Sequence, residues 1–252
     1  KGNLWKFDVS NASPSNWNVA QGGLPLFISG TSKPIISPPA VTFHQKGGQL
    51  ILFGTGKYLE TADTTNTDTQ TMYGIWDYNT SGTLPADSLV QQITSMTTGS
   101  NHRTTTQNLV NYSATVKGWY MDLPISGERL TAIPEIQDGL FRFTTIVPSA
   151  SPCDFGGRGF LNIVNFSTGG MLTRPTFDTN GNRVLSLDDG YSSGIEIGFA
   201  MGGVTSIRNS SIGATSDFAV YSRADGTANN PPVSPGAQGK RGRITWREFS
   251  QE

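Results

Sequence analysis

The sequence contains little cysteine, little histidine and little charge. Cys153 is the one cysteine among 252 residues, so no disulfide can form within the chain, and this thiol is expected either to be buried or to have its partner outside the chain. His44 and His102 lie far apart, and neither belongs to a metal-ligand spacing. The common zinc motifs are therefore excluded. His44 follows an apolar stretch and is predicted to end a strand.

Charged residues make up 15% of the chain, well below the roughly 25% of an average soluble protein. Ser, Thr, Asn and Gly replace them, and the mean hydropathy is -0.29. The net charge of -1 gives no electrostatic reason to expect nucleic acid or an anionic membrane surface as a partner. No apolar run approaches the roughly 18 residues that span a bilayer, so no membrane span is expected. The basic run "GKRGR" (Lys240, Arg241 and Arg243) is short and predicts a solvated turn.

Helix signals are scarce, and the sequence predicts an all-β fold. One short helix is predicted within "LPADSLVQQITSM", where Leu89, Val90 and Ile93 have helical spacing. Short strands bounded by Gly, Pro, Asn, Asp or Ser are predicted nearly everywhere else. The clearest are "QLILFGTGKYL", "TMYGIWDYN", "KGWYMDL", "GLFRFTTIVP", "GFLNIVNF", "GIEIGFA", "SDFAVYS" and "GRITWREF".

Some of these strands recur as variants of one pattern. "GNLWKFDVSNAS" and "GFLNIVNFSTGG" align, with "GRITWREF" as a looser copy. Gly-initiated strands with a central aromatic residue are typical of β-propeller blades, which repeat about every 40 to 50 residues. We therefore expect a modified or partial β-propeller of about four to five blades, forming a single domain over residues 1–252. The first ten residues, "KGNLWKFDVS", already read as an internal blade strand, so the chain is expected to be part of a longer one.

Two polar, low-complexity stretches interrupt the strand pattern, at residues 61–70 and 97–113. Loops commonly carry recognition on a rigid scaffold. The sequence therefore predicts that both stretches are exposed loops and candidate contact surfaces.

Catalytic motifs are few. "GTGKY" at residues 54–58 lacks the first glycine of a phosphate-binding loop and is predicted to be a glycine-rich turn between strands. No Gly-x-Ser-x-Gly nucleophile elbow is present. A glycosidase needs two carboxylates facing each other across a cleft. Many carboxylates are available and sequence alone does not pair them, among them Asp63, Asp68, Asp77, Asp122, Glu128, Glu135, Asp138, Asp188 and Asp189.

The segment "FDTNGNRVLSLDDG" has partial calcium-loop spacing. Possible ligands fall at the first, third, fifth, ninth and twelfth positions, namely Asp178, Asn180, Asn182, Ser186 and Asp189, and a carbonyl of Val184 falls at the seventh. Arg183 stands where such loops need glycine. The alternative is a hairpin, because Asn-Gly is the preferred type I′ turn and would join "RPTF" to "RVLSL". Both readings stay open, with the hairpin favoured.

Six segments together carry a resemblance to a known family. "GNLWKFDVS", "GGLPLF", "FGTGKYLETAD", "YGIWD", "GWYMDLPISGER" and "PSASPCDFGGRGFL" occur in that order over residues 2–161. In this order they resemble the C-terminal domain of the PilY/PilC family, the pilus-tip adhesins and assembly factors of bacterial type IV pili. The resemblance implies a modified β-propeller at the bacterial cell surface, on the outer membrane or at the pilus tip.

The same resemblance implies a non-enzymatic function in pilus assembly, in countering retraction, and in adhesion or surface motility. The implied partners are pilus subunits or minor pilins, with host or surface receptors also possible. Family members carry an Asp-rich calcium loop directly upstream of the "GNLW" strand. No residue of this chain matches that loop, so the resemblance leaves calcium possible in the full-length protein and assigns no catalytic, cofactor or metal residue to this chain.

The alternative is a propeller enzyme, either a glycosidase or a quinoprotein-like dehydrogenase. The "GNLWKFD" strand also resembles quinoprotein repeats. The adjacent cysteine pair of many such dehydrogenases is missing, because only Cys153 is present.

Overall fold

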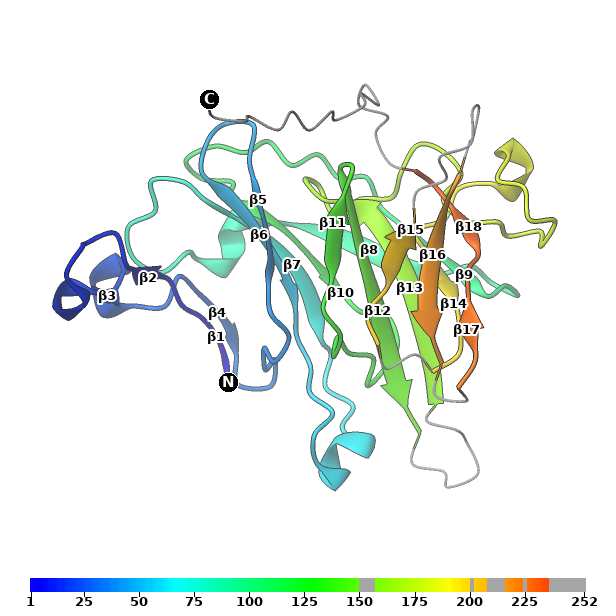
Figure 1. Ribbon diagram of the computed structural model, residues 1–252, viewed down its shortest axis with the longest axis horizontal. Coiled ribbons are helices and arrows are strands. Elements are labelled where there is room, and N and C mark those ends of the chain that lie inside the picture. The colour runs from blue at the N-terminus through cyan, green and yellow to red at the C-terminus, as the bar shows by residue number, and fades with distance from the viewer. Residues whose placement is uncertain (150–156, 200–201, 208–215, 224–225, 236–252) are drawn as a thin grey trace, which may run out of the picture.

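The computed structural model describes residues 1–149, 157–199, 202–207, 216–223 and 226–235, and the regular secondary structure of these residues is mostly β (Figure 1). Cys153, the "GKRGR" run and the "GRITWREF" strand lie outside the described residues. The strands are β1 Gly2–Leu4, β2 Phe7–Asp8, β3 Asn18–Val19, β4 Phe27–Gly30, β5 Ala40–Phe43, β6 Gln49–Gly54, β7 Thr71–Asp77, β8 Leu89–Met96, β9 His102–Thr105, β10 Gly118–Asp122, β11 Glu135–Gln137, β12 Leu140–Pro148, β13 Gly157–Asn165, β14 Gly194–Glu196, β15 Thr205–Ile207, β16 Asp217–Ser222, β17 Ala228–Asn229 and β18 Pro232–Val233.

Ten of these strands form one sheet, in the order β11-β12-β13-β14-β9-β8-β10-β7-β6-β5. Strand β8 joins its two halves, because Leu89–Ile93 pairs with β10 in parallel and Thr94–Met96 pairs with β9 antiparallel. The sheet curves until its end strands β5 and β11 come into contact, so it is nearly closed. The all-β prediction is confirmed.

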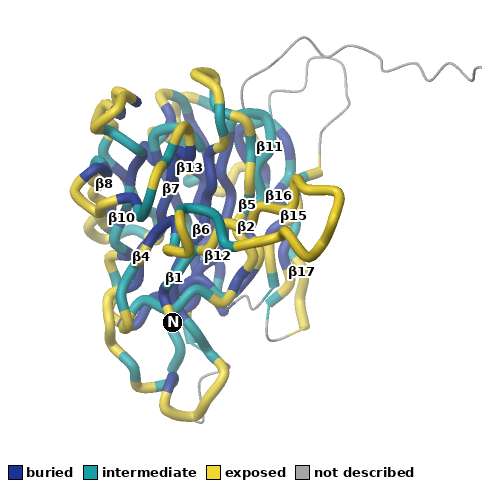
Figure 2. Tube along the Cα trace, turned by 90° about the vertical axis from the view of Figure 1, so that its left-hand side faces the viewer, coloured by how far each residue is buried: buried dark blue, intermediate teal, exposed yellow. Residues whose placement is uncertain are grey.

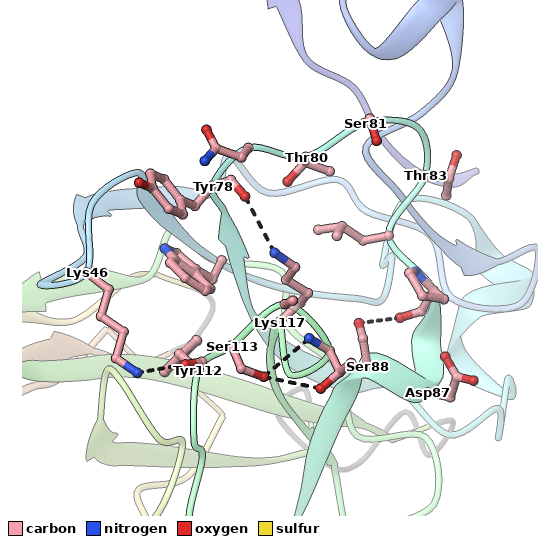
Figure 3. Close-up of a pocket in the computed structure, with 16 residues that line it drawn as sticks. Lys46, Tyr78, Thr80, Ser81, Thr83, Asp87, Ser88, Tyr112, Ser113 and Lys117 are labelled. Carbon is pink, nitrogen blue, oxygen red and sulfur yellow. Dashed lines mark hydrogen bonds between the residues drawn. The ribbon is translucent and has the colours of Figure 1, made fainter.

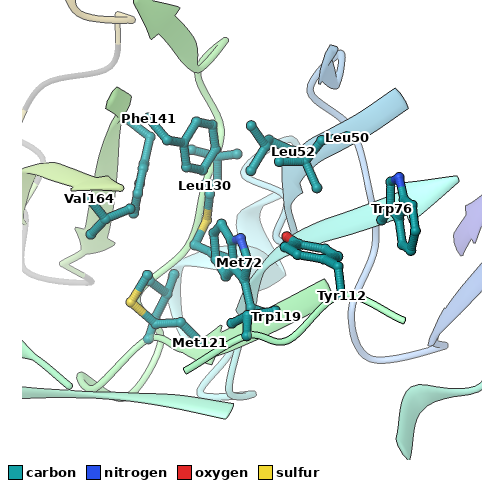
Figure 4. Close-up of a cluster of buried hydrophobic side chains, with 13 residues drawn as sticks. Leu50, Leu52, Met72, Trp76, Tyr112, Trp119, Met121, Leu130, Phe141 and Val164 are labelled. Atoms are coloured by element: carbon teal, nitrogen blue, oxygen red, sulfur yellow. The ribbon is translucent and has the colours of Figure 1, made fainter. Parts of the chain in front are cut away.

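Three hydrophobic clusters hold the layers together. The central cluster fills the inside of the curved sheet, where Leu50, Leu52 and Met72 from one half meet Phe141 and Phe143 from the other (Figure 4). A second cluster packs the outer face of β6 and β7 against residues 26–35. The third packs β12 and β13 against the four-stranded sheet of β15–β18. Figure 2 shows the resulting pattern, with buried strands in the middle and exposed loops around them.

Side chains that point alternately to the two faces of the sheet explain why β6 and β7 are central. In "QLILFG", Leu50 and Leu52 point to the inner cluster and Ile51 and Phe53 to the outer one, so both faces of the strand are apolar. In β7, Gly74 leaves room for Trp119 of β10, because a Cβ there would lie 2.3 Å from the indole nitrogen. Trp119 is fully buried, and its Nε1 donates to the carbonyl of Phe166.

The helix predicted within residues 84–96 is wrong. The structure has a short 3₁₀ helix at Ala86–Ser88 and then strand β8. Two features favour the strand: β-branched residues suit an extended backbone, and pairing with β9 and β10 satisfies its polar groups. The helical spacing was misleading, since Ile93 is 55% exposed while Gln92 is buried and donates to two carbonyls.

The predicted repeats do not adopt equivalent structures. "GFLNIVNF" lies in the long central strand β13, whereas "GNLWKFDVS" forms the short strands β1 and β2, which pair with β4 and β3 outside the ten-stranded sheet. The described strands therefore group into one large sheet with smaller sheets packed beside it, and not into uniform blades. Among the described residues, no helix has the length and hydropathy to cross a membrane.

A buried ion pair lies inside the curve of the sheet. Arg103 of β9 donates to Glu128 over 2.8 Å, and both side chains are at most 1% exposed. Thr145 of β12 donates to the same carboxylate, and Asn162 of β13 accepts from Arg103. The guanidinium also lies 3.7 Å from the ring centroid of Phe160. One buried cluster thus joins Glu128, from the segment between β10 and β11, to β9, β12 and β13 in one half of the sheet.

This pair predicts a large loss of stability for Glu128→Gln. The substitution leaves the charge of Arg103 buried without a counter-charge, which costs about 3–5 kcal/mol. Urea denaturation followed by tryptophan fluorescence measures the loss. As the control, Glu196→Gln breaks the partly exposed pair Arg158–Glu196 and should cost at most about 1 kcal/mol. Equal losses for the two variants would contradict the structural importance of the buried pair.

Candidate functional site

The segment predicted as either a hairpin or a calcium loop, residues 178–189, forms neither paired strands nor a type I′ turn. A type I′ turn needs positive φ at both central residues. Gly181 has a positive φ of 76°, but the φ of Asn180 is not positive. The other left-handed residue in the segment is Arg183, at φ 63°. No strand occurs among residues 178–189. The hairpin prediction is therefore wrong.

Carboxylates organise this loop instead. Asp178 accepts from the backbone N–H groups of Gly181 (2.7 Å) and Arg183 (2.6 Å). Asp189 is 5% exposed and accepts from the N–H groups of Thr179, Asn180 and Ser186. These bonds replace the strand ladder that a hairpin would have formed.

The remaining predicted calcium ligands also accept hydrogen bonds from backbone N–H groups. Asn180 and Asn182 each accept from the N–H two residues further on, and Ser186 accepts from Asp188. Within the described ranges, no group of three or more His, Cys, Asp or Glu side chains could hold a metal ion. With two carboxylates and two amides, the donor set does not fit the Asp-rich loop that the resemblance implies. No metal is assigned to it.

The two polar stretches predicted as exposed loops are partly structural. His102–Thr105 within residues 97–113 is strand β9, and its Arg103 is fully buried. That part of the prediction is wrong, because the ion pair with Glu128 requires this strand inside the sheet. In the other stretch, Thr61–Thr64 forms a 3₁₀ helix with Asp63 buried, although most of residues 61–70 are exposed.

Arg129 holds the 61–70 loop against the body of the protein. Its guanidinium donates to the carbonyl oxygens of Lys57, Asp63 and Asn66, and burial lowers its pKa. Gly56, at φ 126°, allows this approach, since a Cβ there would lie 2.4 Å from that of Arg129. The "GTGKY" segment therefore accommodates an arginine and does not form a phosphate-binding loop.

Three more of the carboxylates considered for glycosidase chemistry have structural partners. Asp77 pairs with Lys6 at 2.6 Å, and Asp122 accepts from Thr71 and Lys33. Asp63 accepts backbone N–H bonds from Leu59 and Glu60, which help to lower its pKa against the effect of desolvation. These carboxylates stabilise the fold.

Two surfaces that the sequence did not predict are better candidates. The first, which we call the N-terminal apolar layer, is the outer face of β1–β4 and β2–β3. Leu4 packs inward and Lys6 reaches Asp77, so the alternating Trp5 and Phe7 point away from the body. The layer consists of Trp5 (42% exposed), Phe7 (63%), Val9 (56%), Trp17 (50%), Leu24 (51%) and Ile28 (49%). Figure 1 shows β2 and β3 standing away from the large sheet.

The second surface is a cavity of about 950 Å³, which we call the aromatic groove (Figure 3). Residues 78–88 form one wall, residues 112–117 form another, and Lys46 and Trp76 lie between them. Trp76 is buried and stacks on Tyr78, with centroids 5.2 Å apart. Its Nε1 donates to the carbonyl of Gly47. The sequence predicts "TMYGIWDYN" as a strand, and the signal for the groove is the aromatic pair Trp76 and Tyr78 at its end.

His44 and Tyr112 complete the aromatic cluster beneath this groove. The His44 ring lies 4.9 Å from Trp76 and 4.3 Å from Tyr112. Burial raises the pKa of Tyr112, whose hydroxyl donates to the carbonyl of Ser167. Desolvation, with a smaller effect from Lys46, lowers the pKa of His44. His44 follows the end of β5, as the sequence predicted.

For the 178–189 loop, Asp189→Asn should destabilise the protein by about 1–3 kcal/mol. The amide replaces an acceptor oxygen with a donor that faces backbone N–H groups, leaving buried donors unsatisfied. Thermal unfolding measures the loss. As the matched control, the exposed neighbour Asp188→Asn should change stability by less than about 0.5 kcal/mol. A loss confined to the control variant would contradict this assignment.

His44 predicts a pH dependence of stability. Because its folded pKa is lowered, the unfolded chain binds more protons, and stability falls as the pH is lowered from about 7 to about 5.5. His44→Gln should reduce this slope in denaturation midpoints measured across that range. An unchanged slope in the variant would contradict the prediction.

The sequence of this chain is similar to that of a known protein family. The family model described as the PilY1 beta-propeller domain matches residues 1–114. A type IV pilus biogenesis factor PilY1 homolog of Xylella fastidiosa is 32% identical over 72% of this chain and 14% of its own length. Type IV pilus biogenesis factor PilY1 of Pseudomonas aeruginosa is 30% identical over 76% of this chain and 20% of its own length. This chain thus spans a fifth or less of these relatives.

A solved structure agrees with these sequence matches. The crystal structure of the Pseudomonas aeruginosa PilY1 C-terminal domain has a TM-score of 0.73 and 26% sequence identity to this chain. The likeness covers 93% of this chain and 56% of that domain. Sequence motifs, family model, relatives and fold agree, and the chain belongs to the PilY1 family, with the β-propeller-type fold of its C-terminal domain.

Proposed function

We propose that this chain acts in type IV pilus biogenesis through contacts between proteins. Its relatives are named type IV pilus biogenesis factors, and their names describe no enzyme. In this proposal the protein is a tip-associated adhesin at the bacterial cell surface. It supports pilus assembly, counters retraction, and mediates adhesion or surface motility. Its proposed partners are pilus subunits or minor pilins.

The N-terminal apolar layer is the observation that carries this proposal. Large contiguous apolar surfaces on a folded protein are typical of interaction sites. Here six bulky apolar residues, three of them aromatic, are each at least 42% exposed on one small layer. Covering them contributes roughly 25 cal/mol per Å² of apolar surface removed from water.

The orientation of the side chains in this layer supports the same proposal. Within "LWKF", Lys6 pairs with the buried Asp77 of β7 while its side chain stays 45% exposed, and Trp5 and Phe7 point away from the body. An isolated monomer would be more stable with the opposite orientation, because apolar side chains gain by burial. This orientation supports contact of the aromatic face with another protein surface.

The polar stretches at 61–70 and 97–113 have a smaller part in this proposal. Arg129 and the buried Arg103 fix the first stretch and the middle of the second within the fold. Around residues 106–109 the chain remains accessible, and Leu109 is 72% exposed. We retain residues 106–109 and the exposed part of 61–70 as secondary contact surfaces.

The combined variant Phe7→Ser and Trp17→Ser, placed in the full-length protein, tests the proposal. Both side chains are at least half exposed, so folding should change little, whereas copurification with pilus subunits should fall about tenfold or more. Surface pili counted by electron microscopy should fall with it. Leu187→Ser is the control, because Leu187 is 78% exposed in the separate 178–189 loop. Normal piliation and copurification in the double variant would contradict the proposal.

A further inference from the structure

The aromatic groove has features of a ligand site that the pilus assembly role does not use. It is lined by an aromatic pair, by hydroxyl and amide side chains and by two lysines (Figure 3). Its volume of about 950 Å³ lies in the range of small-ligand sites. Trp76 is buried, fixed by its bond to Gly47, and stacked on Tyr78, which is 40% exposed. The groove therefore has a rigid aromatic base before any ligand binds.

Charge in the groove favours an anion. Lys46 Nζ donates to the carbonyl oxygen of Tyr112 at 2.7 Å, and Lys117 Nζ lies 3.5 Å from that of Tyr78 and 4.9 Å from the Trp76 ring centroid. Neither amine has a carboxylate partner within the part of the chain that the structure describes. Asp87 is the one acid among the lining residues. A ligand carboxylate would give these lysines the ionic partner that they lack.

The polar side chains at the rim of the groove suit a ligand that carries many hydroxyl groups. Asn79, Ser81 and Thr115 line it as exposed polar residues. The hydroxyl of Thr80 is buried in the lining without a hydrogen-bond partner, a state that costs free energy unless a ligand or water satisfies it. A polyol with both donors and acceptors matches such side chains, and the apolar face of its ring matches an aromatic side chain.

Backbone geometry argues against an extended peptide. Peptides that add to a sheet need a free strand edge. Strand β7, which supplies Trp76, already pairs with β6 and β10 along both edges. The other walls are residues 78–88 and 112–117, which are largely loop on the groove side.

We propose that the aromatic groove binds an acidic oligosaccharide, with its carboxylate held by Lys46 and Lys117 and a sugar ring lying against Tyr78. Binding at this groove is independent of the N-terminal apolar layer. It gives the chain a glycan-binding activity besides its contacts with proteins.

Isothermal titration calorimetry of the purified chain tests this proposal. The probes are trigalacturonate and sialyllactose as acidic saccharides, maltotriose as the neutral saccharide, and tetraglutamate as an acidic peptide, each at millimolar concentration. We expect at least one acidic saccharide to bind, with an affinity that falls as the salt concentration rises. Lys117→Met and Tyr78→Ala should each weaken binding about tenfold. Tyr191→Ala, at an exposed tyrosine that does not line the groove, should leave binding unchanged.

The alternatives are distinguishable. Thermal unfolding of each variant checks that it folds, and Lys117→Arg, which keeps the charge, should restore most of the affinity lost in Lys117→Met. Equal binding of maltotriose would overturn the role of the lysines, and binding of tetraglutamate alone would assign the groove to peptides. No binding of either acidic saccharide, or binding insensitive to Lys117→Met and Tyr78→Ala, would overturn the proposal.

Discussion

The buried pair of Arg103 and Glu128 is the interaction on which the rest of the structure depends. It brings β9, β12 and β13 to one point inside the curve of the sheet, through Thr145 and Asn162. Without a counter-charge, neither ion could remain there, since desolvating an unpaired charge costs several kcal/mol. The central cluster in Figure 4 then fills the space that the curved sheet encloses. Arg129, which follows Glu128 in the chain, donates hydrogen bonds to carbonyl oxygens of the 57–66 segment and so fixes that loop to the same region.

This scaffold presents its two candidate surfaces through one shared segment. Residues 78–88 form a wall of the aromatic groove, and the same segment meets the N-terminal region where Thr83 donates to the carbonyl of Pro25 and Leu84 to that of Leu26. Leu24 of the N-terminal apolar layer is only two residues before Leu26 in the chain. A protein seated on the layer and a ligand in the groove would therefore contact neighbouring but separate parts of the molecule. This arrangement allows contact between proteins and ligand binding to occur together.

Strand positions could be predicted from sequence because period-2 alternation is a local signal. The predicted strands at residues 49–59, 71–79, 117–123, 139–148 and 159–166 all overlap observed strands. The motif "GWYMDLPISGER" also identified the family, and its Glu128 and Arg129 are the buried ions described above. What failed depends on distant residues. Arg103 lies in a polar stretch of sequence, and its burial depends on Glu128, 25 residues away. The strand conformation of β8 depends on pairing with β9 and β10. The aromatic groove could not be predicted, because its walls come from segments that only folding brings together.

The buried pair holds Glu128, and the next two residues join the halves, because Arg129 bonds to Ile146 of β12 and Leu130 donates to the carbonyl of Thr55, which follows β6. We therefore expect the two halves of the ten-stranded sheet to form one cooperative unit. Native-state hydrogen exchange, resolved by strand, tests it most directly. The account predicts that the amides of β12 and β13 in one half, and of β6 and β7 in the other, open with the same free energy, the highest in the chain. An opening free energy for β12 and β13 several kcal/mol below that of β6 and β7 would contradict it, because the halves would then unfold independently.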